Sequence, residues 1–566
     1  MRRCFWVGWV VVIGLSAPSF TRAEEKESRK VWSPDVERIM SVGHEESQVM
    51  DHLDVLCNRI GPRLTGSDNL TNACEWVRDR FASFGINNAH LESWGEFPVG
   101  FNRGPWFGRV VEPEPRPLEF MTMAWSAGTK GTVRGKAVLA PNDQKELDEA
   151  KAKGTLAGSW LLLGRPSGAS GPRPDPAFRR ALRKELGGLK LAGIVAPSPS
   201  ELLVTSGLHR ITWDKLPTLP SVILVRKQFD ELAAWLKDGK TVTLKFDIRN
   251  YFKKGPVVLY NVIADIPGTE WPHEYVIVGG HIDSWDGATG ATDNGTGVAT
   301  TLEAARILMK AGVKPKRTIR FMLWSGEEQG LLGSAAYVKA HKELTPKISA
   351  VLVHDGGTNY LCGIDATEAI FSDFEQVFDP IKALDAKKYP FAVRKVPGLT
   401  GDGSDHASFL AANVPGFIWL QSGVARYQRT HHTQFDTFDA AIPNHQKHSA
   451  MVVALGAYGI ANLDHLLSRD KLRAPGGLAG NVRTLGVQLD ETTVTELEDD
   501  SVAHTGGMKI DDEILKIDGT KVADGMEITR ALRAGGAKKV VTVLREGKEI
   551  ELNLSWEPPA AEKSKP

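Results

Sequence analysis

The segment that most constrains the fold of this chain runs from residue 257 to about residue 468, where apolar runs alternate with helical patterns. The apolar runs cover residues 257–266, 275–280, 318–324, 350–353 and 416–420, and the helical patterns include residues 298–312 and 444–467. Strands that alternate with helices form a mainly parallel sheet with helices on both faces. The expected fold class is therefore α/β, with ligands bound at the carboxyl ends of the strands.

The rest of the 566-residue chain has a different pattern of apolar and polar residues. A chain of this length is expected to form about three to four domains. Residues 120–250 show short β-like runs divided by Gly and Pro, with one amphipathic helix at 227–239 and a basic loop expected at 164–184. The predicted division is a signal peptide at 1–23, the first part of the α/β domain at 24–118, a β-rich insert at 119–252, the rest of the α/β domain at 253–470, a final unit at 481–556 and a disordered tail at 557–566.

The N-terminus resembles an export signal. Arg2 and Arg3 precede the apolar run 5–16, and small residues follow before Glu24. We expect export to a periplasmic or secreted location, with no membrane span after signal cleavage; an uncleaved membrane anchor is the alternative. Lys+Arg and Asp+Glu both count 69, so nucleic acid is not an expected partner.

Four cysteines occur without CxxC spacing, so a thiolate metal site is not indicated. Cys4 would leave with the signal. Cys57 and Cys74 are expected either to form a disulfide or to remain as buried free thiols.

Histidines and carboxylates follow several of the predicted strands. The stretch GGHIDSWDGATGATDNGTGV begins at Gly279, directly after an apolar run. The side chains expected at this sheet edge are His281, Asp283, Asp293, Glu327, Glu328, His354, Asp355, His431 and His432. Roughly four carboxylates in so small a volume repel one another unless divalent cations are present. Imidazole with carboxylate suits zinc, and the inventory fits two metals that share a bridging carboxylate better than one metal.

These residues resemble the co-catalytic di-zinc exopeptidases, the family of bacterial zinc aminopeptidases and glutamate carboxypeptidase II, with the greatest similarity to its carboxypeptidase Q branch. The supporting runs are IGPRLTGSDNL at 60–70, EEQGLLGSAAYVKAHK at 327–342 and HHTQFDT at 431–437. The resemblance covers residues 45–468 approximately and implies a zinc-exopeptidase, phosphorylase/hydrolase-like fold.

The resemblance implies two Zn²⁺ per chain, with other divalent transition metals as alternatives. It implies that one ion is bound by His281, Asp293 and Asp355, and the other by Asp293, Glu328 and His432. Glu327 would be the general base for a hydroxide that bridges the metals, and Asp283 would orient His281. Asp286, His431 and His354 are neighbours that the family pattern does not use as ligands. Candidate substrate-binding residues are Asp405, His406, Arg426 and Tyr427.

The insert resembles a protease-associated domain, and the final unit resembles a PDZ domain. In the latter, Leu485, Gly486 and Val487 match the loop that binds a peptide C-terminus. The function implied is an exported di-zinc metallo-exopeptidase, an aminopeptidase or dipeptidase that acts on peptides or dipeptides, with a carboxypeptidase as the alternative. A non-catalytic receptor-like protein is disfavoured because every ligand and Glu327 are present. A glutaminyl cyclase, which uses one zinc, is disfavoured by the insert and the final unit.

Overall fold

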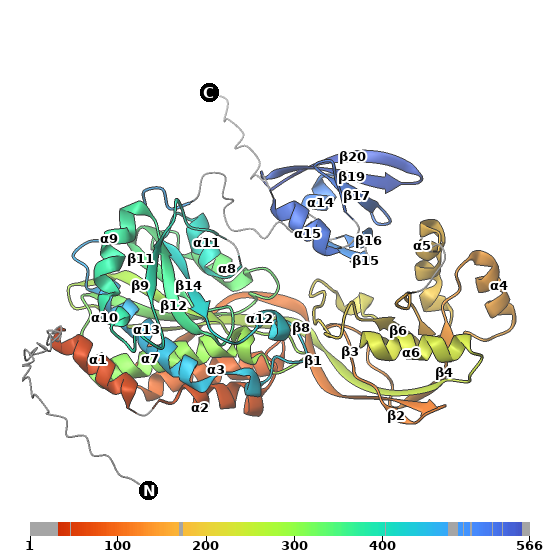
Figure 1. The fold of residues 1–566 in the computed structure, drawn as a ribbon, viewed down its shortest axis with the longest axis horizontal. Helices are drawn as coiled ribbons and strands as arrows, with labels where there is room; N and C mark the ends of the chain where they lie inside the picture. Colours follow the sequence, from red (N-terminus) through yellow and green to blue (C-terminus); the bar gives the residue numbers. More distant parts are fainter. Residues whose placement is uncertain are drawn as a thin grey trace, which may run out of the picture.

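The computed structural model describes residues 32–45, 47–168, 174–401, 403–473, 485–490, 492–497, 501–522, 525–534 and 536–556. The predicted signal peptide and the predicted tail lie outside these residues. Figure 1 shows an α/β domain, an insert that extends from it on two long strands, and a separate C-terminal unit.

The α/β domain is built on a mixed sheet whose central strands are parallel. β9 (Trp271–His281) lies between β10 (Arg317–Trp324) and β11 (Ile348–Val353) and is parallel to both. The outer strands are β14 (Gly416–Ser422), parallel to β11; β12 (Tyr360–Ala366), antiparallel to β14; β13 (Ala392–Lys395), parallel to β12; and β8 (Thr243–Ile266), antiparallel to β10. The expected α/β fold with a mainly parallel centre is confirmed.

Helices cover both faces of this sheet because its central strands are apolar on both sides. In β9, Val276 and Val278 join the larger core, and Ile277 joins a second core on the opposite face. The helices over the larger core are α1 (Pro34–His44), α2 (Val49–Asp54), α3 (Asp68–Ser83), α7 (Thr296–Ala311), α9 (Glu368–Val377), α10 (Asp379–Lys382) and α13 (Pro443–Ala461). The opposite face carries α8 (Leu332–Ala340) and α11 (His406–Ala411).

The insert continues the same sheet rather than forming a detached module. β1 (His90–Glu112) pairs antiparallel with β8 along almost its whole length, and both strands pass from the α/β domain into the insert (Figure 1). The other strands are β2 (Arg116–Pro117), β3 (Phe120–Met121), β4 (Val133–Leu139), β5 (Trp160–Leu162), β6 (Gly193–Pro197) and β7 (Ser221–Leu224). The insert has its own apolar core, which includes Trp160, Phe229 and Phe246.

The prediction of a basic loop at 164–184 is partly wrong. α5 (Pro176–Glu185) occupies its second half, because the Asp175 carboxylate accepts hydrogen bonds from the N–H groups of Ala177 (2.8 Å) and Phe178 (3.2 Å). The insert also contains α4 (Gln144–Ala152), which was not expected, and the expected α6 (Arg226–Lys237). It is therefore an α/β unit and not only β-rich.

The C-terminal unit forms a six-stranded antiparallel sheet around a small apolar core. Its elements are β15 (Val487–Asp490), β16 (Thr493–Leu497), α14 (Val502–Thr505), β17 (Glu513–Ile517), β18 (Thr520–Lys521), α15 (Gly525–Arg533), β19 (Lys538–Arg545) and β20 (Lys548–Ser555). β19 and β20 form the expected hairpin, and Glu546 and Gly547 in its turn both have positive φ.

Cys57 and Cys74 are free thiols in the structure, which decides between the two expectations for this pair. Both are buried, and burial raises the pKa of Cys57 to about 11. Within the described residues, every helix is too short or too polar to cross a membrane.

Candidate metal centre

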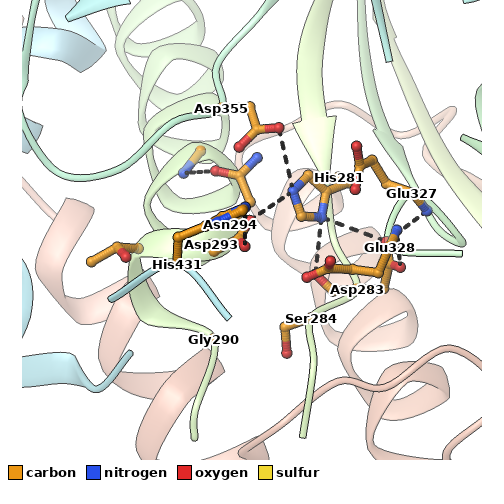
Figure 2. A network of polar contacts seen from close by, with 12 residues as sticks. His281, Asp283, Ser284, Gly290, Asp293, Asn294, Glu327, Glu328, Asp355 and His431 are labelled. Atoms are coloured by element: carbon orange, nitrogen blue, oxygen red, sulfur yellow. Dashed lines mark hydrogen bonds and ion pairs between the residues drawn. The ribbon is translucent and has the colours of Figure 1, made fainter. Parts of the chain in front are cut away.

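Adjacent parallel strands bring the predicted ligands to one edge of the sheet. His281 is the last residue of β9, Glu327 and Glu328 follow the end of β10, and Asp355 follows the end of β11. Asp293 comes from the loop before α7. His432 follows the short helix α12 (Tyr427–Thr430). Because the carboxyl ends of parallel strands meet, residues more than 70 positions apart converge on one site (Figure 2).

The carboxylate of Asp293 lies between two imidazoles. Its Oδ1 is 3.3 Å from Nε2 of His281, and its Oδ2 is 3.1 Å from Nε2 of His432. Nε2 of His281 is also 3.6 Å from Oδ2 of Asp355, and Nε2 of His432 is 2.9 Å from Oε2 of Glu328. Asp293 therefore belongs to both halves of the cluster.

His431 lies at the outer side of the same cluster. Its Nε2 is 3.8 Å from Oδ2 of Asp293, and its ring stacks on His432 with centroids 3.8 Å apart. The group Asp293, His431 and His432 has donor atoms within 4.8 Å of one another, as has the group His281, Asp293 and Asp355. The His431 side chain is 45% exposed, whereas Glu328 is 2% exposed and closer to His432. Glu328 is therefore the better placed donor for a buried ion.

The donor set fits divalent cations. Nε2 of His281 and Oδ2 of Asp293 are buried and have no hydrogen-bond partner among the described residues. Buried polar atoms are rarely left in this state unless an ion or water satisfies them. Imidazole nitrogens that face carboxylate oxygens are the ligands that zinc and similar transition metals prefer.

The pKa shifts of the carboxyl groups in the cluster also favour bound cations. Burial raises the pKa of Glu327 well above its usual range, and the Asp355 and Glu328 carboxylates raise it further. Burial and the Asp293 carboxylate raise the pKa of Glu328 to about 7. Burial opposes ionisation of Asp293, but the adjacent imidazoles of His281 and His432 hold its pKa well below the ordinary value. A site with this surplus of buried carboxylates is stabilised by added positive charge.

Asp283 supports the acid pair directly. Its Oδ1 accepts a hydrogen bond from the N–H of Glu327 (3.3 Å), and its Oδ2 accepts one from the N–H of Glu328 (3.2 Å). Oδ2 also accepts from the hydroxyl of Thr65 (2.8 Å). Nδ1 of His281 lies 3.1 Å from the main-chain oxygen of Asp283 and 3.6 Å from its carboxylate. The carbonyl is thus the nearer partner of the imidazole, and the carboxylate mainly fixes Glu327 and Glu328.

Comparison with known proteins places this geometry in a family. Residues 261–456, which span the α/β domain from β8 to α13, match peptidase family M28. The chain carries a peptidase family M28 domain. Carboxypeptidase Q from Mus musculus is 27% identical over 439 residues, covering 75% of this chain and 88% of that protein. Carboxypeptidase Q from Bos taurus is 28% identical over 443 residues, with the same coverage.

A solved structure agrees with these sequence matches. The crystal structure of a peptidase M28 precursor from Shewanella amazonensis superposes with a TM-score of 0.56 at 25% identity, covering 77% of this chain and 99% of that one. The resemblance to carboxypeptidase Q and the assignment of the chain as a peptidase are therefore confirmed. The match ends within α13, before the C-terminal unit.

The sequence reading missed a buried arginine that supports the M28 metal loop. Arg63 is fully buried and donates hydrogen bonds from its guanidinium to the main-chain oxygens of Ile282 (2.7 Å), Thr289 (3.0 Å) and Gly290 (2.8 Å). Its own N–H donates to Oγ of Ser284 (3.0 Å). One side chain thus ties together both ends of the loop between His281 and Asp293. Arg63 lies in the run 60–70, which supports the family resemblance but does not indicate this contact.

A second residue that the sequence did not single out holds Asp293, the candidate for a bridging carboxylate. Oδ1 of Asp436 accepts hydrogen bonds from the N–H and the hydroxyl of Thr292 (2.6 and 2.8 Å), and Oδ2 accepts from the N–H of Asp293 (3.2 Å). Burial raises the pKa of Asp436 to about 7.

Asp286, the alternative to Asp283, instead forms a buried ion pair with Arg103 (2.9 Å).

The candidate substrate residues of the M28 domain differ in how close they lie to the ligands. Tyr427 packs against the ring of His431 with centroids 4.8 Å apart, and the carboxylates of Asp293 and Asp355 contribute to raising its pKa, after burial. Asp405 is fully buried, and burial raises its pKa to about 7. His406 faces the main-chain oxygen of Thr400 (3.1 Å), a contact that holds its loop.

Arg426 is exposed, at the entrance to α12. A small cavity beside the ligands is lined by Thr205, Trp285, Ala288, Gly290, Asp293, Glu328, His432, Thr433 and Asp436. Neither Arg426 nor the other three predicted substrate residues lines this cavity, whereas Trp285, which no motif singled out, does.

Proposed function

We propose that the chain is an exported zinc-dependent exopeptidase that hydrolyses peptide bonds at peptide termini, as an aminopeptidase or dipeptidase. One observation carries the proposal: the Asp293 carboxylate presents one oxygen to His281 and the other to His432, and each imidazole has a second carboxylate beside it, Asp355 at His281 and Glu328 at His432. The family match and the N-terminal apolar run at 5–16 support the peptidase activity and the export, respectively.

Two ions are proposed, with Asp293 shared between them. His281 and Asp355 complete one set of ligands, and Glu328 and His432 complete the other. When bound, such a pair polarises the scissile carbonyl and lowers the pKa of a water molecule. The ring of Trp285 lies 6.2 Å from the ring of His432 and would pack against the substrate residue next to the scissile bond.

Glu327 is proposed as the general base and then the general acid. Its carboxylate would take a proton from the attacking water and return it to the amine that leaves. Burial and the neighbouring carboxylates raise its pKa, which suits a carboxyl group that must donate a proton as well as accept one. Asp283, through the N–H of Glu327, fixes where that carboxylate lies.

The residues around the centre favour recognition of a free substrate amino group over a free carboxylate. Among the described residues that line the cavity there is no Lys or Arg, and Arg426 stands outside it. The cavity therefore offers no basic side chain to pair with a C-terminal carboxylate. A carboxypeptidase remains the second candidate, because two curated relatives carry that name.

The experiment is a substrate panel for the purified full-length protein with added zinc. The panel contains leucine and alanine p-nitroanilides, dipeptides, N-acetylated peptides and C-terminally amidated peptides. The proposal predicts cleavage that requires a free N-terminus and tolerates an amidated C-terminus. Cleavage of N-acetylated peptides with release of the last residue would establish the carboxypeptidase instead.

We also propose that the insert is a protease-associated domain and that residues 481–556 form a PDZ domain. The antiparallel sheet around a small core and the positive φ of Gly486 support the second assignment. Fluorescence anisotropy with a library of labelled peptides tests it. Binding must require a free C-terminal carboxylate and disappear for the amidated peptides.

A further inference from the structure

The insert reaches the candidate metal centre at Thr205. Thr205 donates two hydrogen bonds to the main-chain oxygen of His432, from its N–H (2.7 Å) and from its hydroxyl (3.1 Å). Next to this contact along the two segments, Val204 pairs antiparallel with Thr433, and the N–H of Leu203 donates to Oε1 of Gln434 (2.8 Å). A strand-like segment of the insert, residues 203–205, therefore runs along residues 432–434, which begin with a candidate ligand.

His432 has a backbone conformation that requires support. Its φ is +57°, in the left-handed region that residues with a Cβ seldom adopt. Holding a non-glycine residue there is strained, and the surrounding contacts must offset that strain. The two hydrogen bonds from Thr205 are placed to do so, because they hold the carbonyl of the same residue whose Nε2 faces Asp293 and Glu328.

Thr205 itself has little freedom to move. Its side chain is buried, and it lines the cavity beside Asp293 and Glu328. A Cβ on Gly287 would lie 1.9 Å from Cγ2 of Thr205. The glycine in the metal loop is therefore needed for this close approach between the loop and the insert.

We infer that Thr205 is a positioning residue for His432, so that the second metal site depends on the insert being docked against residues 432–434. This inference rests on the proposed function, because it assumes that His432 binds a metal ion. It assigns the insert a structural part in the metal centre. The first site, with His281 and Asp355, has no ligand in contact with this segment among the described residues, and it is expected to be independent of the insert.

The test measures zinc affinity of the full-length, metal-free protein by competition with a chromophoric chelator, so that no substrate is needed. Thr205→Val removes the hydroxyl and keeps the shape. The N–H of Thr205 still donates to His432 in this variant, so one of the two hydrogen bonds is lost. We expect zinc affinity at the second site to fall by about 3–10-fold, the effect of one hydrogen bond. Thr205→Ser restores the donor and should bind zinc within about twofold of the wild type, less than the effect of one hydrogen bond.

Two backgrounds assign the effect to a site. With Asp355→Asn the site of Glu328 and His432 remains, and Thr205→Val should weaken it. With Glu328→Gln the site of His281 and Asp355 remains, and Thr205→Val should leave it unchanged. The matched control is Thr129→Val: Thr129 is another insert threonine whose hydroxyl contacts the main chain, accepting from the N–H of Ile248 (2.8 Å), away from the metal centre. This control should leave both affinities unchanged.

If Thr205→Val does not fold, Gln434→Leu provides a second variant, because it removes the acceptor of the Leu203 N–H without touching Thr205. It should weaken the second site in the same direction, by a smaller factor. Equal weakening of both sites, unchanged zinc binding in the variant that folds, or no recovery with serine would overturn the inference. Wild type that binds no zinc would overturn the proposed function, whereas a wild type with two ions and an unaffected Thr205→Val removes only this inference.

Discussion

Oδ2 of Asp293 lies 3.1 Å from Nε2 of His432. The other oxygen of the same carboxylate faces the second imidazole, His281, at 3.3 Å. No other side chain in the described part of the chain joins both halves of the cluster in this way. The proposed pair of metals requires such a shared carboxylate, whereas two unrelated ion pairs do not. Substitution of Asp293 is therefore expected to affect zinc binding differently from substitution of a ligand of one site.

Asp293→Asn is expected to reduce zinc binding at both sites, whereas Asp355→Asn should affect one. The amide keeps the volume of the side chain but lacks the charge that both ions require. The measurement is bound zinc per chain after dialysis, by elemental mass spectrometry. We expect about one ion in Asp355→Asn and fewer in Asp293→Asn, relative to about two in the wild type. Equal losses in the two variants would contradict a bridging role for Asp293.

Asp283→Asn is expected to slow turnover more than it weakens substrate binding. Its carboxylate accepts the N–H groups of Glu327 and Glu328, so the change misplaces the proposed base while the ligands remain. Loss of an orienting group of this kind lowers activity by about 10–100-fold. Steady-state kinetics should show most of this loss in kcat. A change confined to KM would indicate that Asp283 acts on the substrate instead.

Arg63→Met is expected to destabilise the metal-free protein. Two buried carbonyls and one partly buried carbonyl lose their donor, and each buried unpaired group costs about 1–3 kcal/mol. In a domain of this size the melting temperature should fall by about 5–10 °C. Arg59→Met is the matched control, because Arg59 is exposed and pairs only with Asp54 at the surface. Similar melting temperatures for the two variants would show that the Arg63 contacts do not hold the loop.

The free energy of unfolding is expected to depend on pH through His448. The residue is buried against Tyr389, with ring centroids 4.4 Å apart, and burial lowers its pKa to about 4. The unfolded chain takes up this proton near pH 6.5, so the contribution is fully present above that pH and is lost as the pH falls towards 4. The loss amounts to about 3 kcal/mol.

His448→Phe keeps an aromatic ring and removes the titrating group, so it should flatten the fall in unfolding free energy between pH 7 and pH 4. The exposed His273→Phe is the control and should behave as the wild type does. Chemical denaturation of the metal-free proteins at several pH values measures the difference. An unchanged slope for His448→Phe would show that another group controls this pH range.

The α/β fold and the converging ligands could be predicted because both are recorded in local patterns. A strand such as 275–280 is recognised from its own residues, and the topology of a parallel sheet then brings His281, Glu328 and Asp355 together. α5 was missed because Gly and Pro in the preceding residues indicated a loop, although Asp175 and Pro176 are helix-start residues.

The supporting residues could not be predicted in the same way. Arg63 acts on main-chain oxygens more than 200 residues away, and nothing in the local sequence of either segment records this contact. Asp436 lies in the run 431–437, but its role depends on the path of the loop at Thr292. Thr205 lies in a different unit from His432, so its contact depends on how the insert packs.

In the proposed mechanism, buried carboxylates and imidazoles hold two ions, and Glu327 takes a proton from water and passes it to the leaving amine. The most direct measurement is the zinc content and the kcat of the wild type and of Glu327→Gln, determined on the same preparations with a substrate that the wild type cleaves. The account predicts about two zinc ions per chain in both proteins and a kcat lower by about 10²–10⁴-fold in the variant. A variant that retains kcat within about tenfold of the wild type, or an active wild type without zinc, would contradict it.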